Sequence, residues 1–540
     1  MPAEPNVLHS IDLRSVFPFI QIFRAFRVAM QPSKLVLALV ALLLIYVGGR
    51  VLDRIFPAAY PGEARLYASS FLSFRANSDF RDSVKQAREA TNEQYNELFT
   101  RMYRLANPDA TNPPPESFNK EIGQQIAKER QKAVDAASRQ FTKDDEKVQL
   151  NSAIESIYAQ AAQQMKLVEL RHGRGPFAEF MEFEADRVNA AALSVITFKF
   201  VEFDPEGRPG GGLLGALFDI VVVGPSWLLS QHPWFAILLA WWGLLMVAIF
   251  GGAISRIAAV EVAREEKISI RNALRFSFAK LVSYVSAPIM PLLVVIGIAL
   301  LLAIAGWLSE LAFIGGTLTV VIGIAFCVAI FLAVLAGLAL IGVVGGFGLM
   351  YPTISVEGSD SFDAVSRAFS YVFARPWRVF FYSLVAVIHG ALTYLFLRFF
   401  VWVTLLLAHT FLLLWTGPRH AGDTSLRHIF PTPQFSELHP AVSGFNLTGT
   451  EYVASGVLSF WAYLFITLLG AYLLSWYLSA NTIIYYLLRQ EIDAAELDEV
   501  YLEPSDEEFD DLDEPAPETK VEPAAAAAAP APTPDAPPQT

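Results

Sequence analysis

The sequence predicts an all-α integral membrane protein with about six transmembrane helices, an extramembrane helical hairpin and a disordered C-terminal tail. Of its 540 residues, 54% are hydrophobic and 17% are charged, and the mean hydropathy is +0.40. This composition is too apolar for an ordinary soluble protein. The apolar residues form runs of about 20, the length that crosses a hydrocarbon core of roughly 30 Å.

The net charge of −13 is concentrated near the C-terminus. The stretch 491–514 is rich in Asp and Glu and contains no Lys or Arg. The acidity therefore belongs to one tail, and it gives no reason to expect nucleic acid as a partner. Residues 491–540 combine this acidic stretch with a Pro- and Ala-rich end, a composition that predicts disorder.

The N-terminal segment 1–34 is basic and carries apolar residues at helical spacing. This pattern predicts an amphipathic helix on a membrane surface. The first transmembrane helix follows at 35–55, where Lys34 and Arg50 are expected to extend to the two interfaces. We interpret this region as an uncleaved signal anchor.

Residues 56–212 are charged and polar, and we expect them to lie outside the membrane. Apolar positions recur at a spacing of three to four in 84–105 and in 150–168. Consecutive prolines in 107–117 separate the two helices. The pattern predicts a long antiparallel, coiled-coil-like hairpin with a kink near Thr142.

A strand is predicted after this hairpin. Residues 194–203 alternate between apolar and polar side chains and end at a turn signal. The segment 441–453 is the candidate partner strand.

The polytopic membrane domain covers 213–490. Residues 213–229 carry Asp219 and Pro225, which predicts an interfacial or re-entrant segment. The run 380–415 is too long for one straight crossing, so we place Arg398 at an interface, with 399–415 lying along the bilayer or re-entering it. The remaining spans are predicted near 234–253, 286–307, 317–343, 379–398 and 455–487.

The distribution of Lys and Arg predicts the orientation. The connections 254–285 and 346–378 are basic, whereas 308–316 contains no basic residue. The positive-inside rule then places both basic connections in the cytoplasm. Six crossings place both termini in the cytoplasm and residues 56–212 outside.

The two cytoplasmic connections carry similar amphipathic segments. Ser269 and Ser361 are candidate N-caps. Arg275 and Arg367 lie off the apolar stripe of the helix that follows each serine. Each segment therefore predicts an interfacial helix that leads into a transmembrane helix, and duplication and convergence both remain open as its origin.

The second segment carries a family resemblance. Residues Pro352–Ile354, Glu357, Ala364, Arg367 and Phe369–Ser370 resemble a pattern of the YciC-like group and of the membrane domain that precedes some bacterial glycerophosphodiester phosphodiesterases. The resemblance covers about 254–400 and departs from the pattern at Ala368, where a serine is expected. It implies a helix on the cytoplasmic face and brings no established activity.

The sequence contains no motif that predicts catalysis. A phosphodiesterase barrel of about 250 residues would not fit the largest extramembrane stretch. We expect no enzyme activity and no cofactor. Two groups could bind a metal, although a solvated helix face explains the first better: Glu179, Glu182, Glu184 and Asp186 with His172, and the loop residues His420, His428 and His439.

Ionisable residues inside a membrane domain are functional candidates. These are His389, Arg398 and Asp219, and for His389 a hydrogen bond between helices is the plain alternative. Gly342 and Gly346 form a Gly-x-x-x-Gly pair, which predicts close helix packing or association of two copies.

Two main functions follow from these features. The first is a non-enzymatic scaffold that binds protein partners through the hairpin and the acidic tail. The second is a transporter for a small or amphiphilic substrate, which would use His389 and the repeated segments. A membrane enzyme would require the loop histidines to bind metal.

Overall fold

The computed structural model describes residues 17–56, 59, 62–64, 66, 77–109, 112–141, 147–203, 209–310, 315–414, 429–435, 437–439, 449–496 and 498–501. The chain divides into two units, residues 1–500 and 501–540. Tyr501 is the described residue of the second unit, and the predicted disordered tail otherwise lies outside the described residues. All elements below belong to the first unit.

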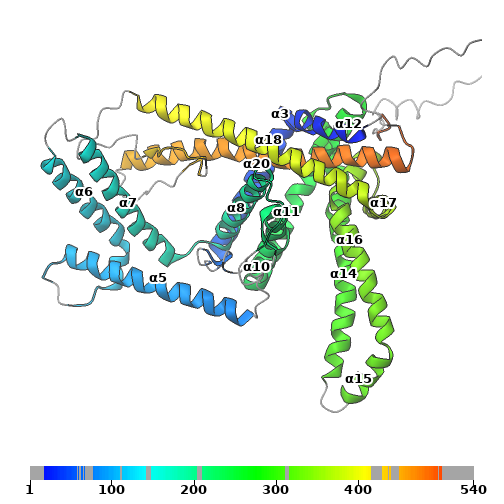
Figure 1. Ribbon diagram of the computed structural model, residues 1–540, viewed down its shortest axis with the longest axis horizontal. Helices are drawn as coiled ribbons and strands as arrows, with labels where there is room; N and C mark the ends of the chain where they lie inside the picture. Colours follow the sequence, from blue (N-terminus) through cyan, green and yellow to red (C-terminus); the bar gives the residue numbers. More distant parts are fainter. Residues whose placement is uncertain are drawn as a thin grey trace, which may run out of the picture. The chain divides into compact units, whose positions relative to one another are not determined.

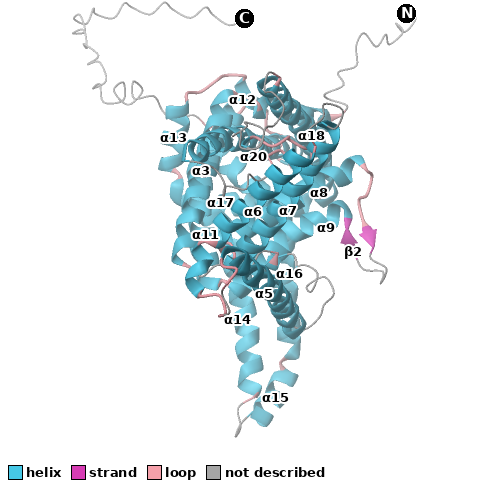
Figure 2. Ribbon diagram, turned by 90° about the vertical axis from the view of Figure 1, so that its left-hand side faces the viewer, coloured by secondary structure: helices cyan, strands magenta, loops and turns pink. Residues whose placement is uncertain are grey.

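Helices make up nearly all of the described secondary structure (Figure 2). Two short strands, β1 (Glu202–Phe203) and β2 (Pro209–Gly211), pair antiparallel. The short helical turns are η1 (Pro18–Phe23), η2 (Glu116–Lys120) and the π-helical turns η4 (Asp219–Val223) and η5 (Val247–Gly251). The α-helices are α2 (Arg24–Ala29), α3 (Pro32–Ile55), α5 (Asn77–Ala106), α6 (Ile122–Gln140), α7 (Lys147–His172), α8 (Pro176–Ile196), α9 (Gly212–Phe218), α10 (Gly224–Gln231), α11 (Pro233–Met246), α12 (Gly252–Arg264), α13 (Ile270–Ala279), α14 (Leu281–Ser309), α15 (Gly315–Ile324), α16 (Phe326–Glu357), α17 (Ser361–Ala374), α18 (Pro376–Leu413) and α20 (Gly449–Ile492).

Seven helices in the described part of the chain are long and apolar enough to cross a membrane, which supports a multi-pass membrane protein. Six of them overlap the predicted spans. The seventh, Gly212–Gln231, coincides with the segment that the sequence predicted to be interfacial or re-entrant. The seven are Pro32–Ile55, Gly212–Gln231, Pro233–Arg264, Leu281–Leu308, Phe326–Glu357, Pro376–Leu413 and Val453–Ile492.

Two predicted spans have different limits in the structure. The run 317–343 is divided, because α15 ends at Ile324 and α16 begins at Phe326. The run 380–415 is not divided, because α18 continues through Arg398 for 38 residues, or about 57 Å. Arg398 lies within the helix and not at an interface. Its buried guanidinium donates hydrogen bonds to Asn189 and to the Phe435 carbonyl oxygen.

Helix α12 lies at the centre of the main hydrophobic core. Every residue from Gly252 to Val260 is buried, as are residues 349–356 of α16. The C-terminal third of α20 completes this core. A helix that is buried all round must be covered on every face, and α13, α16 and α20 all pack against α12.

The N-terminal segment is part of this core. Ala25 and Ala29 of α2 are fully buried, and α2 packs against α20. Lys34 does not extend to an interface as predicted. It is fully buried, and its Nζ lies 2.6 Å from Glu261 Oε2 and 2.8 Å from the Val28 carbonyl oxygen. A buried ammonium requires such partners.

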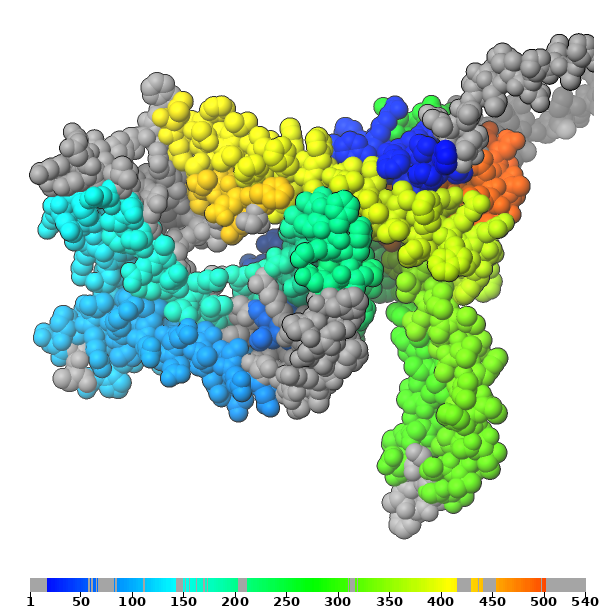
Figure 3. Space-filling model, in the orientation of Figure 1, coloured from blue at the N-terminus to red at the C-terminus, as the bar shows by residue number. Residues whose placement is uncertain are grey.

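Helices α14 and α16 lie side by side (Figure 1). Their apolar side chains are largely exposed, with only 11% and 6% of the residues buried in one apolar 18-residue stretch of each helix. The space-filling view shows this pair, in green, with an open surface along most of its length (Figure 3). Cys327 is exposed on α16 and is therefore not a core residue. Both helices suit direct contact with lipid.

In the described part of residues 56–172, the region after the prolines contains two α-helices, α6 and α7, where the predicted hairpin had one arm. Helices α5, α6 and α7 share one apolar core. Helix α6 ends at Gln140, α7 begins at Lys147, and the two helices pack against each other. The kink predicted near Thr142 lies outside the described residues. The core residues are Tyr95, Leu98, Phe99, Met102, Phe118, Ile122, Ile126, Ala161, Met165 and Val168.

The predicted strand 194–203 is also wrong over most of its length. Helix α8 continues to Ile196, and only Glu202–Phe203 is extended. Its partner is β2, on the other side of the predicted turn. Residues 449–453 of the expected partner are helical in α20.

Candidate functional site: a polar seam along helix α8

Helix α8 is fixed at its N-terminus by α3. Gly175 is the N-cap residue and offers no side chain, so Asp53 Oδ1 accepts the bond from the Phe177 backbone N–H at 2.8 Å. A Cβ at Gly175 would lie 2.1 Å from Asp53 Cγ, which explains the glycine. Asp53 also pairs with Arg50 at 3.1 Å. A carboxylate at a helix N-terminus satisfies a free N–H and opposes the helix dipole.

The second attachment of α8 is an ion pair with η4. Arg187 Nη1 lies 3.3 Å from Asp219 Oδ2, and the Asp219 side chain is only 5% exposed. Asp219 begins the π-helical turn η4. Such turns widen a helix by one residue and often mark functional sites.

Glu184 extends the same polar group. A Cβ at Gly224 would lie 2.1 Å from Glu184 Oε1, so this carboxylate occupies the space beside the glycine. Glu184 Oε1, Asp219 Oδ1 and Arg187 Nε are buried, and none of these atoms has a hydrogen-bond partner in the described part of the chain. Burial and then the charge of Asp219 raise the pKa of the Glu184 carboxyl to about 8, while Arg187 acts in the opposite direction.

The third attachment joins α8 to α18. Arg398 Nη1 donates to Asn189 Oδ1 at 2.8 Å, and the Tyr394 hydroxyl donates to the same oxygen at 2.7 Å. Arg398 Nη2 and Nε donate to the Phe435 carbonyl oxygen at 2.9 and 3.2 Å. Its guanidinium also lies 5.4 Å from the Phe435 ring centroid. One buried arginine therefore joins α8, α18 and the loop 429–439.

These contacts define the α8 seam as Glu184, Arg187, Asn189, Asp219, Tyr394 and Arg398. Two of the three predicted intramembrane residues, Asp219 and Arg398, lie in it and contact the same helix. The sequence did not predict Arg187 or Asn189 as their partners. The only signal was a polar residue at each of these α8 positions, within a segment assigned to the extramembrane region.

His389 does not belong to this seam. Its ring centroid lies 5.1 Å from that of Phe23 and 6.3 Å from that of Trp476. Its Nδ1 has no hydrogen-bond partner among the described residues, so the predicted hydrogen bond between helices is not seen at this atom. The ring serves mainly as an aromatic contact.

Arg367 lies in a second polar group at the other end of α18. Its Nε lies 2.8 Å from Glu357 Oε2 and 3.3 Å from Asp363 Oδ2. Glu357 also accepts a bond from the Tyr485 hydroxyl at 2.6 Å and lies 3.4 Å from Arg489 Nε. We call Glu357, Arg367, Tyr485 and Arg489 the Glu357 cluster. It joins the ends of α16, α17 and α20.

The acidic segment that follows α20 begins beside this cluster. Asp493 Oδ2 lies 3.8 Å from Arg367 Nη1 and accepts a bond from the Tyr371 hydroxyl. Glu491 pairs with Arg378 and accepts a bond from the Tyr382 hydroxyl at 2.7 Å. Burial, followed by the bond to Asp493, raises the pKa of Tyr371.

One of the two predicted N-cap residues is confirmed. Ser269 is the N-cap of α13 and accepts a bond from the Asn272 N–H at 3.2 Å. The prediction for Ser361 is wrong, because Asp360 is the N-cap of α17 and accepts from Asp363 N–H at 2.9 Å. Arg275 is exposed on α13.

The structure also reveals a hydroxyl that the sequence did not single out as a hydrogen-bond donor. Ser277 Oγ donates to the carbonyl oxygens of Ala248 and Ile249, at 2.9 and 2.6 Å. These carbonyls lie in η5, where the π-helical turn interrupts the regular ladder. Ser277 therefore stabilises η5, the π-helical turn within the candidate span Pro233–Arg264.

The Gly-x-x-x-Gly pair is covered within one chain. A Cβ at Gly342 would lie 2.6 Å from the Phe369 ring, and one at Gly346 would lie 3.3 Å from Ala368 Cβ. Close helix packing is thus observed, with α17 as the partner helix. Association of two copies through these glycines stays a prediction.

The described residues contain no group of three or more side chains that could hold a metal ion. Glu179 accepts a bond from the Gly62 N–H at 2.7 Å, and Glu182 pairs with Arg174. His439 Nε2 lies 3.1 Å from Ser459 Oγ, and burial lowers the His439 pKa. His420 and His428 lie outside the described residues.

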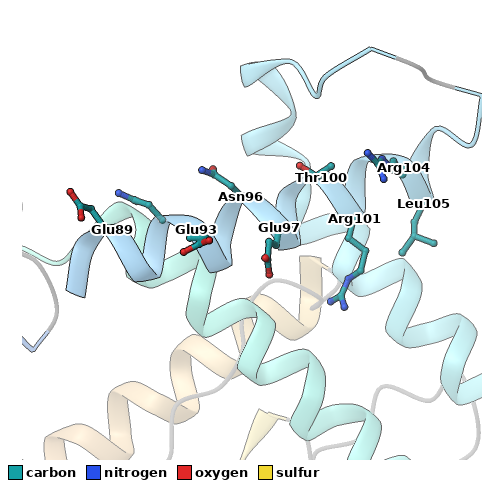
Figure 4. A pocket seen from close by; sticks show the side chains of 9 residues that line it. Glu89, Glu93, Asn96, Glu97, Thr100, Arg101, Arg104 and Leu105 are labelled. Atoms are coloured by element: carbon teal, nitrogen blue, oxygen red, sulfur yellow. The ribbon is translucent and has the colours of Figure 1, made fainter. Parts of the chain in front are cut away.

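A shallow hollow lies along α5, outside the membrane spans. Its described lining comes from one helix and carries both charges (Figure 4). The lining residues are Glu89, Asn92, Glu93, Asn96, Glu97, Thr100, Arg101, Arg104 and Leu105.

No family model, no curated protein and no solved structure matches this chain. The resemblance to the YciC-like group therefore stays a prediction.

Proposed function

We propose that this chain is a non-enzymatic multi-pass protein of a bacterial inner membrane that holds an extramembrane three-helix module in a fixed position for protein partners. The observation that carries this proposal is the attachment of α8 to three different membrane helices. Asp53 binds its first turn, Asp219 pairs with Arg187, and Arg398 binds Asn189.

The connection between module and membrane domain is short. Helix α7 ends at His172 and α8 begins at Pro176, so three residues separate them. Each hydrogen bond to a charged group contributes about 1.5–3 kcal/mol. A flexible tether would need none of the three. A rigid attachment suits a protein that presents a binding surface at a constant distance from the membrane and at a constant angle to it.

The hollow along α5 is the surface that we propose for partner binding. It presents Glu93, Glu97 and Arg101 on one exposed stripe, beside Asn96 and Thr100. Carboxylates and guanidinium groups at successive turns favour a protein segment that carries both charges. In this proposal the acidic tail, on the cytoplasmic side, is a second segment that binds protein partners.

The proposal is tested in living cells with the full-length chain. A photo-crosslinking residue replaces Glu97 in the hollow. The matched control replaces Lys85, which lies on the same helix and is 74% exposed but does not line the hollow. We expect one or a few discrete crosslinked proteins from position 97 that are absent from position 85. No specific product from position 97 would count against the docking surface.

The sidedness is part of the proposal. We propose six crossings, with Gly212–Gln231 re-entrant from the outer side, both termini cytoplasmic and residues 56–212 outside. The burial of 50% of this segment inside the protein supports this view, as do its π-helical turn and Pro225. Reporters fused after Gly210 and after Gln490 should give opposite signals, and equal signals would overturn the map.

Transport is the second candidate function. The observation that favours it is the pair of π-helical turns, η4 and η5, in two consecutive candidate spans, with buried Asp219 at the first. Interrupted helices frequently line substrate sites in transporters. Its test is the uptake of whichever solute the deletion strain fails to accumulate. Full uptake by both Asp219→Asn and His389→Ala would remove this candidate.

A further inference from the structure

Within the α8 seam, Glu184 and Asp219 share one nearby cation, Arg187, because the other cation, Arg398, binds Asn189 and the Phe435 carbonyl oxygen. Glu184 and Asp219 both approach Arg187, and the ion pair observed joins Arg187 to Asp219 alone. Glu184 Oε1 is buried without a hydrogen-bond partner in the described structure. An ionised carboxylate in such a position is costly, and a buried carboxyl beside a second carboxylate commonly keeps its proton.

The local backbone is built to admit this carboxyl. Gly224 ends the π-helical turn that Asp219 begins, and any larger residue at 224 would meet Glu184 Oε1 at 2.1 Å. The widened turn places Asp219 and the glycine at one face of the helix, toward α8. Glu184 Oε1 occupies the space beside Gly224, and Asp219 Oδ1, at the start of the same turn, is also buried without a hydrogen-bond partner in the described structure. Both observations favour a proton on one of the two carboxyl groups.

We propose that Glu184 and Asp219 form a proton-binding site in which one exchangeable proton is held between α8 and the η4 turn. The site goes beyond the mounting role proposed above, since proton binding can be measured without any partner protein. With the proton bound, the group of Glu184, Asp219 and Arg187 carries one negative and one positive charge and is neutral overall. Without it, two carboxylates face one guanidinium across the interface between α8 and η4.

The other charged groups around α8 are occupied elsewhere. On α3, Asp53 binds the first turn of α8 and pairs with Arg50. On α18, Arg398 binds Asn189 and the Phe435 carbonyl oxygen. At the start of α10, Gly224 is the residue that lies beside Glu184. Arg187 and Asp219 are therefore the charges that act on Glu184.

The direction of the pH effect follows from the Glu184 pKa, which the folded protein raises from its ordinary value of 4.5 to about 8. Between these two pH values the unfolded chain has lost this proton and the folded chain retains it. The stability of the folded state therefore falls as the pH rises from about 4.5 to 8, and it levels off above that. Contact between α8 and η4 should be strongest on the acidic side.

The proton is detected by infrared difference spectroscopy on the purified full-length protein in lipid nanodiscs, titrated from pH 6 to pH 9.5. We expect a band of a protonated carboxyl group at pH 6 that disappears with a midpoint near pH 8. Glu184→Gln should remove the band while preserving the fold, because glutamine has the same shape. The control Glu182→Gln, on the exposed face of α8, should leave it unchanged.

Two further variants test the neighbours. Asp219→Asn should move the midpoint of the band to lower pH, because it removes the repelling charge. Arg187→Gln should move the midpoint to higher pH, because it removes the cation. A band that survives in Glu184→Gln, or a midpoint that neither neighbour shifts, would overturn the proposal. If the band behaves as expected but position 97 gives no crosslinked partner, the proposed partner-binding function is rejected and the proton-binding site is retained.

Discussion

Replacing Glu357 by alanine should destabilise the junction of α16, α17 and α20. The carboxylate is 10% exposed and accepts three interactions, from the Tyr485 hydroxyl at 2.6 Å, Arg367 at 2.8 Å and Arg489 at 3.4 Å. Each bond to a charged group contributes about 1.5–3 kcal/mol when buried. Arg367 is 41% exposed, so its pair is worth only about 0.5–1 kcal/mol.

The Tyr485 and Arg489 interactions dominate the sum, because Arg489 is only 15% exposed. Together the three give a loss of about 3–5 kcal/mol for Glu357→Ala, the range found when one partner of a buried pair is removed. Glu357→Gln keeps an acceptor for Tyr485 and loses the charge, so we expect about 1–3 kcal/mol.

The measurement is reversible unfolding of the full-length chain in mixed detergent micelles, followed by tryptophan fluorescence. Glu266→Ala is the matched control, since Glu266 is exposed on the loop before α13. A double-mutant cycle with Arg489→Met isolates the pair. If the free energies of unfolding of Glu357→Ala and of the control differ by less than about 0.5 kcal/mol, the Glu357 cluster does not stabilise the fold and the reasoning is refuted.

Three further predictions use neighbouring residues. A Cβ at Gly252 would lie 2.5 Å from Ser277 Oγ, so Gly252→Ala should cost about 1–3 kcal/mol, whereas Gly243→Ala in the same span has open space and should be neutral or slightly stabilising. Ser277→Ala should cost about 1–3 kcal/mol, because it leaves two buried carbonyls of η5 without their donor. Asp360→Ala should cost about 1 kcal/mol, while Ser361→Ala should change stability by only a few tenths. Unfolding in the same micelles checks all three, and an equal loss at 360 and 361 would contradict the observed cap.

The sequence predicted the long apolar helices well, because a run of 20 apolar residues has few other stable environments. It could not predict which polar residues meet. Lys34 was expected at an interface, but its partner Glu261 is 227 residues away. Asp219 and Arg398 were recognised as unusual, whereas their partners on α8 were not. No local pattern shows that α8, which belongs to the segment predicted to be extramembrane, will pack against α3, α9 and α18.

The sequence also could not show how the helices pack against one another. The periodicity of 150–168 predicts a helix correctly, but the apolar stripe of 122–137 can pack against either neighbour. The three-helix arrangement depends on tertiary contacts such as Phe118 with Phe99, whose ring centroids lie 5.4 Å apart. At the start of α17, Asp360 and Ser361 are both good caps. The backbone decides between them, because Asp360 is extended at φ −86° and ψ −178°.

The two segments predicted to be interfacial helices share a construction that does not depend on their arginines. Helices α12 and α16 both end in a left-handed residue, Glu265 at φ 58° and Gly358 at φ 63°. A short link then leads to a cap residue that binds the N–H three positions later.

Counted from each cap, the fourth residue is a buried alanine, Ala273 or Ala364, and the eighth is a buried small residue, Ser277 or Ala368. The arginines do not correspond, since Arg275 is six residues after its cap and Arg367 is seven after its own. Small residues one turn apart let α13 approach α12 and α17 approach α16 closely. The repeated element is therefore a packing face. The eighth position needs a small side chain in both segments, and it carries a hydroxyl at Ser277, where η5 leaves carbonyls to bind.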